Sequence, residues 1–278
     1  MVNDVSWIRK VEDFCYKYNI PTEYLAEVLN EPKVVPMLRG KAFEFTVMMA
    51  LDSILPKAVW QVDKPAINAQ FGSHDMDVRV RHLPTGTVIT PECKLAANMG
   101  VVLTDDGYRI RVKCMRSRTL GTARAALIGA ELGIPTEVVM VHNDQYTPRD
   151  FDLVITSIGN AFYSTDIDTG LYEWNPSATA EAFLRNLIPS EGYANLKDLV
   201  FNKMYVARSS DLPVSPLTGV TCTRQKCEHR SDCGFIPNYP LIIFDRGTLE
   251  VKRPWVPIED SVHLFESIVK KSTGSAGI

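Results

Sequence analysis

Apolar positions in about the first 160 residues follow two periods, one typical of helices and one typical of strands. The helical period predicts helices over residues 4–29, interrupted at Pro21, and over residues 39–55 and 122–132. Alternating or continuous apolar runs predict strands over residues 59–62, 78–80, 87–90, 108–114, 136–142 and 151–158. A helix that leads from one strand to the next is typical of a parallel crossover. We therefore predict an α/β fold with a mixed central β-sheet flanked by helices.

The pattern becomes less regular after about residue 164. A helix is predicted near residues 180–187, and the turn-rich sequence that follows it contains three cysteines. We expect residues 1–165 to hold the N-terminal helices and the core. Residues 166–278 are expected to form an irregular C-terminal region that serves recognition, dimerisation or metal binding.

Composition limits the classes of protein to which the chain can belong. Its 278 residues are 45% hydrophobic, which is enough for a substantial core. The formal net charge is −3, so a nucleic-acid surface would need local clustering of basic residues. No run of about eighteen apolar residues occurs and the start lacks a signal-peptide pattern, so we expect a cytoplasmic protein with no membrane partner. The six cysteines are then expected to be thiols or metal ligands.

Residues 72–95 carry the signature of a β-hairpin. The turn Leu83–Gly86 separates two β-rich runs. If these four residues form the loop, cross-strand partners have numbers that add to 169. Asp77 then lies opposite Glu92, with the two Cβ atoms about 5 Å apart. Strand alternation places Lys94 on the same face as Glu92, whereas Cys93 points to the other face.

Two carboxylates and one ammonium on one face are suited to metal-dependent hydrolysis of a phosphodiester. Mg²⁺ prefers oxygen ligands about 2.1 Å away and keeps several waters. It lowers the pKa of a bound water, and a neighbouring lysine can orient that water or stabilise charge on the phosphate. Asp77 and Glu92 fit the ligand role and Lys94 fits the second role. Glu44 lies at the edge of the apolar stripe of its predicted helix, where a metal would offset the cost of burying a carboxylate.

Other interpretations of these residues are open. A two-residue shift of the hairpin would pair Asp75 with Lys94, although the four-residue loop favours Asp77 as the ligand. Glu44 could also lie beside the apolar stripe of its helix with its carboxylate in water, and it would then need no metal. The whole set would be an ordinary surface hairpin if its charged residues faced solvent.

The sequence Pro91–Lys94, with Asp77 and Glu44 upstream, resembles the motif of the PD-(D/E)XK nuclease superfamily. The resemblance covers residues 40–142 and includes the order helix, three strands, helix, strand. It implies a restriction endonuclease-like core in which Asp77 and Glu92 bind Mg²⁺, the lysine assists the attacking water and Glu44 completes the metal site. The length of the chain and its lack of helicase motifs are similar to type II restriction endonucleases, which usually cut double-stranded DNA as homodimers.

Residues 96–118 depart from the pattern of that superfamily, because they add sequence between the motif strand and the following helix. From residue 109 to residue 124 the chain is basic and contains no acidic residue. Alternation along the strand places three cations on one side, where they would neutralise a DNA backbone, and the next two arginines could reach guanine edges. A solvated strand face is the alternative. The candidate DNA-binding residues are Arg109, Arg111, Lys113, Arg116 and Arg118.

A cluster of cysteines near the C-terminus is a second candidate site. Cys222, Cys227 and Cys233 enclose His229, and three thiolates with one imidazole can form a tetrahedral zinc site. The spacing differs from a paired C-x2-C knuckle. Helicase-linked relatives in the nuclease superfamily bind an iron–sulfur cluster through one N-terminal and three C-terminal cysteines, and that resemblance would make Cys15 the fourth ligand. Buried thiols without metal are the remaining interpretation.

These observations favour a Mg²⁺-dependent endonuclease of the restriction type that cuts double-stranded DNA at a specific sequence as a homodimer. A structure- or end-specific DNA repair nuclease, with an iron–sulfur cluster, is one alternative. A non-catalytic DNA-binding protein with a zinc-stabilised C-terminal region is another, in which the acidic residues are only structural.

Overall fold

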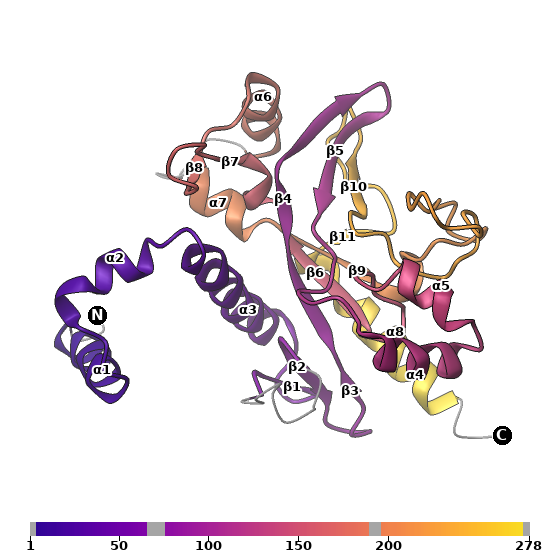
Figure 1. Ribbon diagram of the computed structural model, residues 1–278, viewed down its shortest axis with the longest axis horizontal. Coiled ribbons are helices and arrows are strands. Elements are labelled where there is room, and N and C mark those ends of the chain that lie inside the picture. The colour runs from indigo at the N-terminus through magenta and orange to yellow at the C-terminus, as the bar shows by residue number, and fades with distance from the viewer. Residues whose placement is uncertain (1–3, 66–75, 189–195, 275–278) are drawn as a thin grey trace.

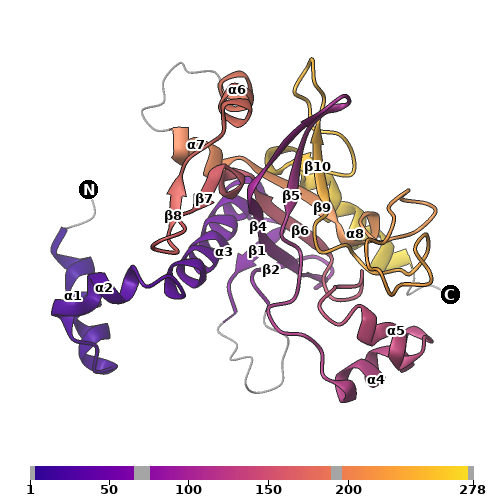
Figure 2. The same cartoon turned by 45° about the horizontal axis from the view of Figure 1, so that its top comes forward.

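The structure is a computed structural model that describes residues 4–65, 76–188 and 196–274 (Figures 1 and 2). The α-helices are α1 (Asp4–Lys17), α2 (Leu25–Leu29), α3 (Val34–Ile54), α4 (Thr122–Leu132), α5 (Thr136–Val141), α6 (Ala178–Leu187), α7 (Leu196–Asn202) and α8 (Val262–Gly274). The strands are β1 (Trp60–Asp63), β2 (Arg79–His82), β3 (Val88–Ile89), β4 (Pro91–Thr104), β5 (Gly107–Val112), β6 (Leu153–Ser157), β7 (Tyr163–Thr165), β8 (Tyr172–Trp174), β9 (Met204–Arg208), β10 (Leu241–Phe244) and β11 (Val256–Pro257). Among the described helices, none is long and apolar enough to cross a membrane.

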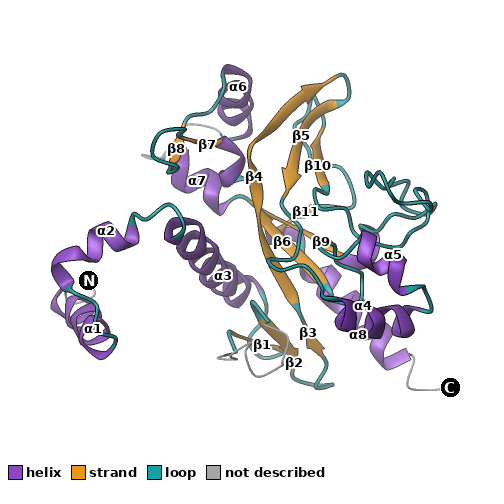
Figure 3. Cartoon of the chain, viewed as in Figure 1, coloured by secondary structure: helices purple, strands orange, loops and turns teal. Residues whose placement is uncertain are grey.

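A mixed sheet forms the centre of the molecule, with the strand order β10-β5-β4-β6-β9-β11 (Figure 3). Its central strands β4 and β6 are parallel, and α4 and α5 lie in the connection between them. The other neighbours in the sheet pair antiparallel. These pairings confirm the predicted α/β class with a mixed central sheet. The parallel partner of β4 is β6, not the strand that was expected directly after the helix 122–132. Strands β9, β10 and β11 come from beyond residue 165, so both predicted regions contribute to one sheet.

Helices cover both faces of the central sheet. On one face, α3 and α8 enclose a buried cluster that includes Leu153 and Ile155 of β6. On the other face, α6 and the 3-10 helix Gly159–Phe162 pack in a second cluster that includes Val154. Successive residues of β6 therefore enter opposite clusters, as the two-residue period of a strand requires. β6 is buried on both faces, which explains its continuous apolar sequence.

The predicted hairpin forms with the predicted register but in a smaller sheet than expected. β1, β2 and β3 form a separate three-stranded sheet, in which Val80 pairs with Ile89 and Arg81 with Val88. Both pairs have numbers that add to 169, which confirms the four-residue loop. β3 ends at Ile89, and the chain then enters the central sheet as β4, which pairs with β5 and β6. Glu92 thus belongs to the central sheet.

Residues 136–142 were expected to form a strand, and the structure corrects this prediction. They form the short helix α5, which begins directly after Pro135, and His142 is the first residue after it. Val139 of α5 packs against Ala125 and Ile128 of α4. A short apolar run is compatible with a buried strand or a buried helix, because period alone does not separate them at this length.

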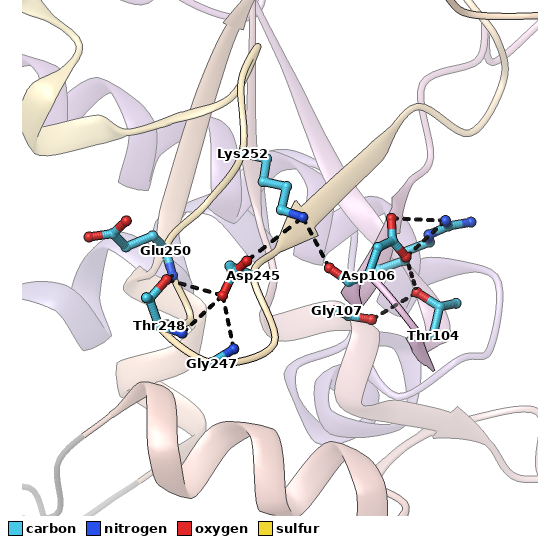
Figure 4. A network of polar contacts seen from close by, with 9 residues as sticks. Thr104, Asp106, Gly107, Asp245, Gly247, Thr248, Glu250 and Lys252 are labelled. Atoms are coloured by element: carbon cyan, nitrogen blue, oxygen red, sulfur yellow. Dashed lines mark hydrogen bonds and ion pairs between the residues drawn. The ribbon is translucent and has the colours of Figure 1, made fainter.

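The inserted residues extend β4 to Thr104 and return as β5, and Figure 4 shows how the turn between them is held. Lys252 Nζ donates to the carbonyl of Asp106 at 3.1 Å and lies 3.9 Å from Oδ2 of Asp245 (Figure 4). Gly107 has a φ of 133°, and a Cβ atom there would lie 1.9 Å from the carbonyl oxygen of Phe244. Only glycine fits this close approach between β5 and β10.

Replacing Gly107 with alanine is expected to lower the free energy of unfolding by about 2–4 kcal/mol, because both the φ angle and the contact with Phe244 disfavour a side chain. Urea denaturation followed by circular dichroism measures the change. Gly40→Ala on α3 is the matched control, since a Cβ there meets no atom within 4 Å and alanine favours helix. Equal stability of the Gly107→Ala variant and the wild type would contradict the described turn.

Candidate functional site: an acidic centre with a lysine, and a cysteine–histidine cluster

Three elements contribute the acidic residues and the lysine of the candidate site. Glu44 lies on α3, Asp77 lies two residues before β2, and Glu92 and Lys94 lie on β4. The Cys93 amide donates to Oδ2 of Asp77 at 2.9 Å, so the backbone of the motif strand holds this carboxylate. The Asp77 residue is 9% exposed, and Cys93 points into the core as the alternation of the strand predicts. The side chain of Asp77 therefore joins the hairpin sheet to the central sheet.

Glu92 and Lys94 form an ion pair on one face of β4, and the hydroxyl of Tyr146 contacts both side chains. Lys94 Nζ lies 2.6 Å from Oε1 of Glu92. The hydroxyl of Tyr146 donates to the same carboxylate oxygen at 2.9 Å and accepts from Lys94 Nζ at 3.2 Å. Tyr146 comes from the segment that follows α5, far from β4 in the sequence. The three polar ends therefore converge from two parts of the chain.

Glu44 is buried beside this group, and its charged partners are lysines. The residue is 7% exposed, and Lys41 Nζ lies 2.9 Å from its Oε1. Lys64 forms an ion pair with Oε2 of Glu44 and donates to the carbonyl of Asp77 at 3.0 Å. The sequence indicated that a carboxylate at this position needs a partner, and two ammonium groups fill that role. Lys64 links Glu44 to the backbone that carries Asp77.

Burial and the neighbouring carboxylates together determine the electrostatics of the centre. Burial, followed by the charges of Glu92 and Glu44, raises the pKa of Asp77 to about 7, although the Cys93 amide and Lys94 oppose the shift. Burial disfavours the charge on Lys94, but Glu92 and Tyr146 outweigh it and raise the pKa of this ammonium. Lys94 therefore keeps its proton at neutral pH. The centre can orient water and stabilise negative charge on a ligand.

The candidate DNA-binding residues have different surroundings. Arg111 and Lys113 are exposed on one side of β5 and its continuation, and Arg118 is exposed in the segment before α4. Arg109 is half-buried and pairs with Asp106 at 3.0 Å. Arg116 is largely enclosed, because its side chain is 13% exposed and lies 2.7 Å from Oδ1 of Asp150. Arg116 thus has a structural partner within the protein, whereas the three exposed cations are accessible to a ligand.

Three of the predicted cysteines form a compact cluster with a histidine. His142, Cys222, Cys227 and Cys233 each offer one ligand atom, and these atoms all lie within 4.8 Å of one another. His142 follows α5, and the cysteines lie in the irregular segment between β9 and β10. These four residues could hold a metal ion.

The histidine of this cluster corrects the sequence prediction, which placed His229 beside the cysteines. The side chain of His229 is 63% exposed and lies 3.6 Å from Asp232. The parallel crossover places His142 at the cluster instead, so the fourth residue comes from another part of the chain. Helix α1, which carries Cys15, lies at the opposite end of the molecule from this segment in both views, so Cys15 is remote from the cluster (Figures 1 and 2).

The hydrogen bonds around His142 leave one of its ring nitrogens free to bind a metal ion. Nδ1 lies 2.6 Å from Oε1 of Gln145, and the amide nitrogen of that glutamine donates to the carbonyl of Ile236 at 2.9 Å. Because this fixes Oε1 as an acceptor, Nδ1 carries the proton and Nε2 presents its lone pair. Nε2 is buried without a hydrogen-bond partner among the described residues. Burial lowers the pKa of His142, which favours the neutral ring that binds metals.

Burial disfavours the thiolate form of two cysteines of the cluster in the absence of a metal. Burial raises the pKa of Cys227, and it raises that of Cys233 to about 12. The sulfur of Cys222 accepts from the Arg224 amide at 3.4 Å, a contact that would stabilise a thiolate. A bound cation would replace the thiol protons, since metal binding and deprotonation are coupled.

Sequence reasoning missed Lys64, Tyr146 and His142. Each reaches its site through a long-range contact, and no local spacing marks any of the three. Asp75, the alternative to Asp77, lies outside the described residues.

The raised pKa of Asp77 predicts that the protein without divalent cations loses stability as pH rises. The native state keeps this proton up to about pH 7, whereas an unfolded aspartate releases it near pH 4, so the native state binds more protons between these values. The free energy of unfolding should therefore fall between pH 5 and pH 7.5, and Asp77→Asn should reduce the fall. Urea denaturation across this range tests it, with the exposed Asp168→Asn as control. An unchanged pH dependence in Asp77→Asn would refute the assignment.

Comparisons with known proteins leave the site to be interpreted from its own residues. No protein-family model matches the chain, and neither a curated protein nor a solved structure matches it. The resemblance to PD-(D/E)XK nucleases therefore depends on the motif residues of the sequence alone.

Proposed function

We propose that the chain is a Mg²⁺-dependent endonuclease of the restriction type, which hydrolyses phosphodiester bonds of double-stranded DNA. The observation that carries the proposal is the hydrogen bond from the Cys93 amide to Asp77, 2.9 Å long. It brings Asp77 to the strand on which Glu92 and Lys94 share one face. A carboxylate from a hairpin and a carboxylate and a lysine from the adjoining strand are the chemical set of a metal-dependent nuclease.

The carboxylates have the chemistry that Mg²⁺ requires. The described hydrogen bonds use Oδ2 of Asp77 and Oε1 of Glu92, and each carboxylate has a second oxygen to offer a cation. The raised pKa of Asp77 supports the fit, because a divalent cation would relieve the repulsion that favours its protonated form. When bound, Mg²⁺ would lower the pKa of a coordinated water and neutralise charge on the phosphate. Glu44 would complete the site if the cation displaced its lysines.

The residues of the chain have separate tasks in the proposed reaction. Lys94 is charged at neutral pH, so it orients the attacking water and stabilises the phosphate and does not remove a proton. The oxygen of that water forms a bond to phosphorus while the water gives up a proton to solvent. The bond from phosphorus to the leaving sugar oxygen breaks, and that oxygen takes a proton from solvent. Arg111, Lys113 and Arg118 are exposed cations that would contact phosphates near the site. Two copies of the chain would cut the two strands of a symmetric site.

We also propose that zinc occupies the cysteine–histidine cluster. Three thiolates and one imidazole make a closed four-ligand set, which is typical of structural zinc. The orphaned Nε2 of His142 and its orientation by Gln145 support a ligand role, since metal-bound histidines donate their other ring nitrogen to an acceptor. An iron–sulfur cluster of the expected kind would need Cys15, which lies on the remote helix α1.

Replacing Lys94 or Glu92 with alanine should abolish cleavage and leave DNA binding intact. Loss of the lysine removes charge stabilisation, for which we expect a fall of at least about 100- to 1000-fold in the single-turnover rate. Cleavage on a gel and binding by mobility shift are measured together, with the exposed Glu173→Ala on β8 as control. Wild-type cutting by either site variant would exclude the assignment. Intact DNA with every protein would favour the non-catalytic alternative.

The purified protein should contain about one zinc per chain by mass spectrometry of metals. Cys222→Ser and His142→Ala should lose the zinc, whereas His229→Ala should keep it, because its side chain lies outside the cluster. Iron together with absorbance near 400 nm would instead indicate an iron–sulfur protein and a repair nuclease. Retention of zinc in His142→Ala would contradict the ligand set.

A further inference from the structure

We propose that the cysteine–histidine cluster is a clamp that holds Tyr146 against Glu92 and Lys94, which makes Tyr146 a positioning residue of the nuclease site. The inference rests on the proposed function and on zinc as the metal. It assigns the metal centre a role in cleavage through one named side chain. The contacts between the cluster and Tyr146 carry the argument.

The segment after α5 connects the two centres within a few residues. His142 lies in the cluster, and Tyr146 follows four residues later. Between them, Gln145 bonds to the ring of His142 and to the carbonyl of Ile236. The amide of Ile236 donates in turn to the carbonyl of Tyr146 at 2.8 Å. A metal on His142 would therefore fix the backbone on both sides of Tyr146.

The cysteine-bearing segment holds the same loop from a second direction. Arg224, two residues after Cys222, forms an ion pair with Asp144. The side chain of Asn238 donates to the other oxygen of that carboxylate at 2.8 Å. A metal bound to both Cys222 and His142 would add a second link between the cysteine-bearing segment and residues 142–146. Loss of the metal would leave the segments of Cys222 and His142 linked by these polar contacts and by the apolar packing of Val141 against Cys222.

Arg116 fixes the ring of Tyr146 once the loop is in place. Its Nε donates to the carbonyl of Gln145 at 3.0 Å, and its Nη2 donates to Asp150 at 2.7 Å. The guanidinium lies over the ring of Tyr146, 4.7 Å from the ring centroid. Phe151 packs against another side of the ring, with centroids 5.1 Å apart. These contacts on two sides of the ring restrict its orientation.

That orientation presents the hydroxyl to the acidic centre. It donates to Oε1 of Glu92 and accepts from Lys94, and the ammonium also lies 5.2 Å from the ring centroid. With one oxygen of Glu92 tied to Tyr146 and Lys94, the other oxygen has a defined direction for a cation. Lys94 is likewise prevented from turning away. Tyr146 acts through these two residues and need not contact DNA itself.

Tyr146→Phe removes only the hydroxyl and is the first test. Because a hydrogen bond to a charged group is lost, the single-turnover cleavage rate at saturating DNA should fall about ten- to hundredfold. DNA affinity and zinc content should stay at wild-type values. Tyr108→Phe is the control, since this half-buried ring packs on Phe183 away from the centre. Cleavage by Tyr146→Phe at the wild-type rate would overturn the role of the hydroxyl.

The clamp itself is tested by combining Tyr146→Phe with Cys222→Ser, which removes a zinc ligand. If zinc acts through Tyr146, the cleavage rate of Cys222→Ser falls at least as far as that of Tyr146→Phe. The double variant then cleaves at the same rate as Cys222→Ser alone. A further loss in the double variant, equal to the loss in the wild-type background, would overturn the clamp.

Hydrogen exchange provides a second measurement that needs no cleavage. Removal of zinc from the wild-type protein should speed amide exchange in residues 143–150 and 91–95, while residues 79–89 stay protected. Unchanged exchange in residues 143–150 would overturn the clamp even if the chain is a nuclease. If the wild-type protein cuts no DNA but shows this loss of protection, the clamp stands and the proposed function fails.

Discussion

The hydrogen bond from the Cys93 amide to the Asp77 carboxylate is the contact on which the acidic centre depends. It joins a small hairpin sheet to the first residues of β4, where the chain passes from one sheet into the other. A carboxylate buried at such a junction is costly unless the backbone or a charge pairs with it, and here the amide does so directly. Glu92 and Lys94 lie on the same strand, so this one bond fixes the distance between the two halves of the centre. The helix α3 then encloses it through Glu44 and the lysine that bridges to the hairpin.

Much of the fold could be predicted from the sequence, because most of its elements have strong local patterns. The four-residue turn fixed the register of Val80 with Ile89, and the alanine-rich helix α4 has the predicted bounds. Alternation also placed Ile110 and Val112 in the core and Arg111 between them outside. Local pattern was insufficient at Thr136–Val141, where a short buried helix and a buried strand have the same apolar sequence. It was also insufficient after Ile89, where the strand changes sheets.

The residues of the sites were predictable only where they are close in sequence. Asp77, Glu92 and Lys94 belong to one hairpin and its continuation, so period and turn length brought them together. His142 and Tyr146 reach their positions through the parallel crossover from β4 to β6, which no spacing in the sequence encodes. His229 lies among the cysteines in the sequence, yet its side chain faces solvent. The crossover therefore explains both the histidine of the cysteine–histidine cluster and the position of Tyr146 beside Glu92 and Lys94.

The most direct test of the central claim is to incubate the purified wild-type protein with unmethylated phage-length DNA and Mg²⁺ and to separate the products on a gel. Discrete fragments that require Mg²⁺ are the expected result, and their ends would give the recognition sequence. A smear would indicate a repair nuclease that uses the same centre. DNA that remains intact on several unmodified substrates would contradict the assignment of Asp77, Glu92 and Lys94 as a nuclease centre.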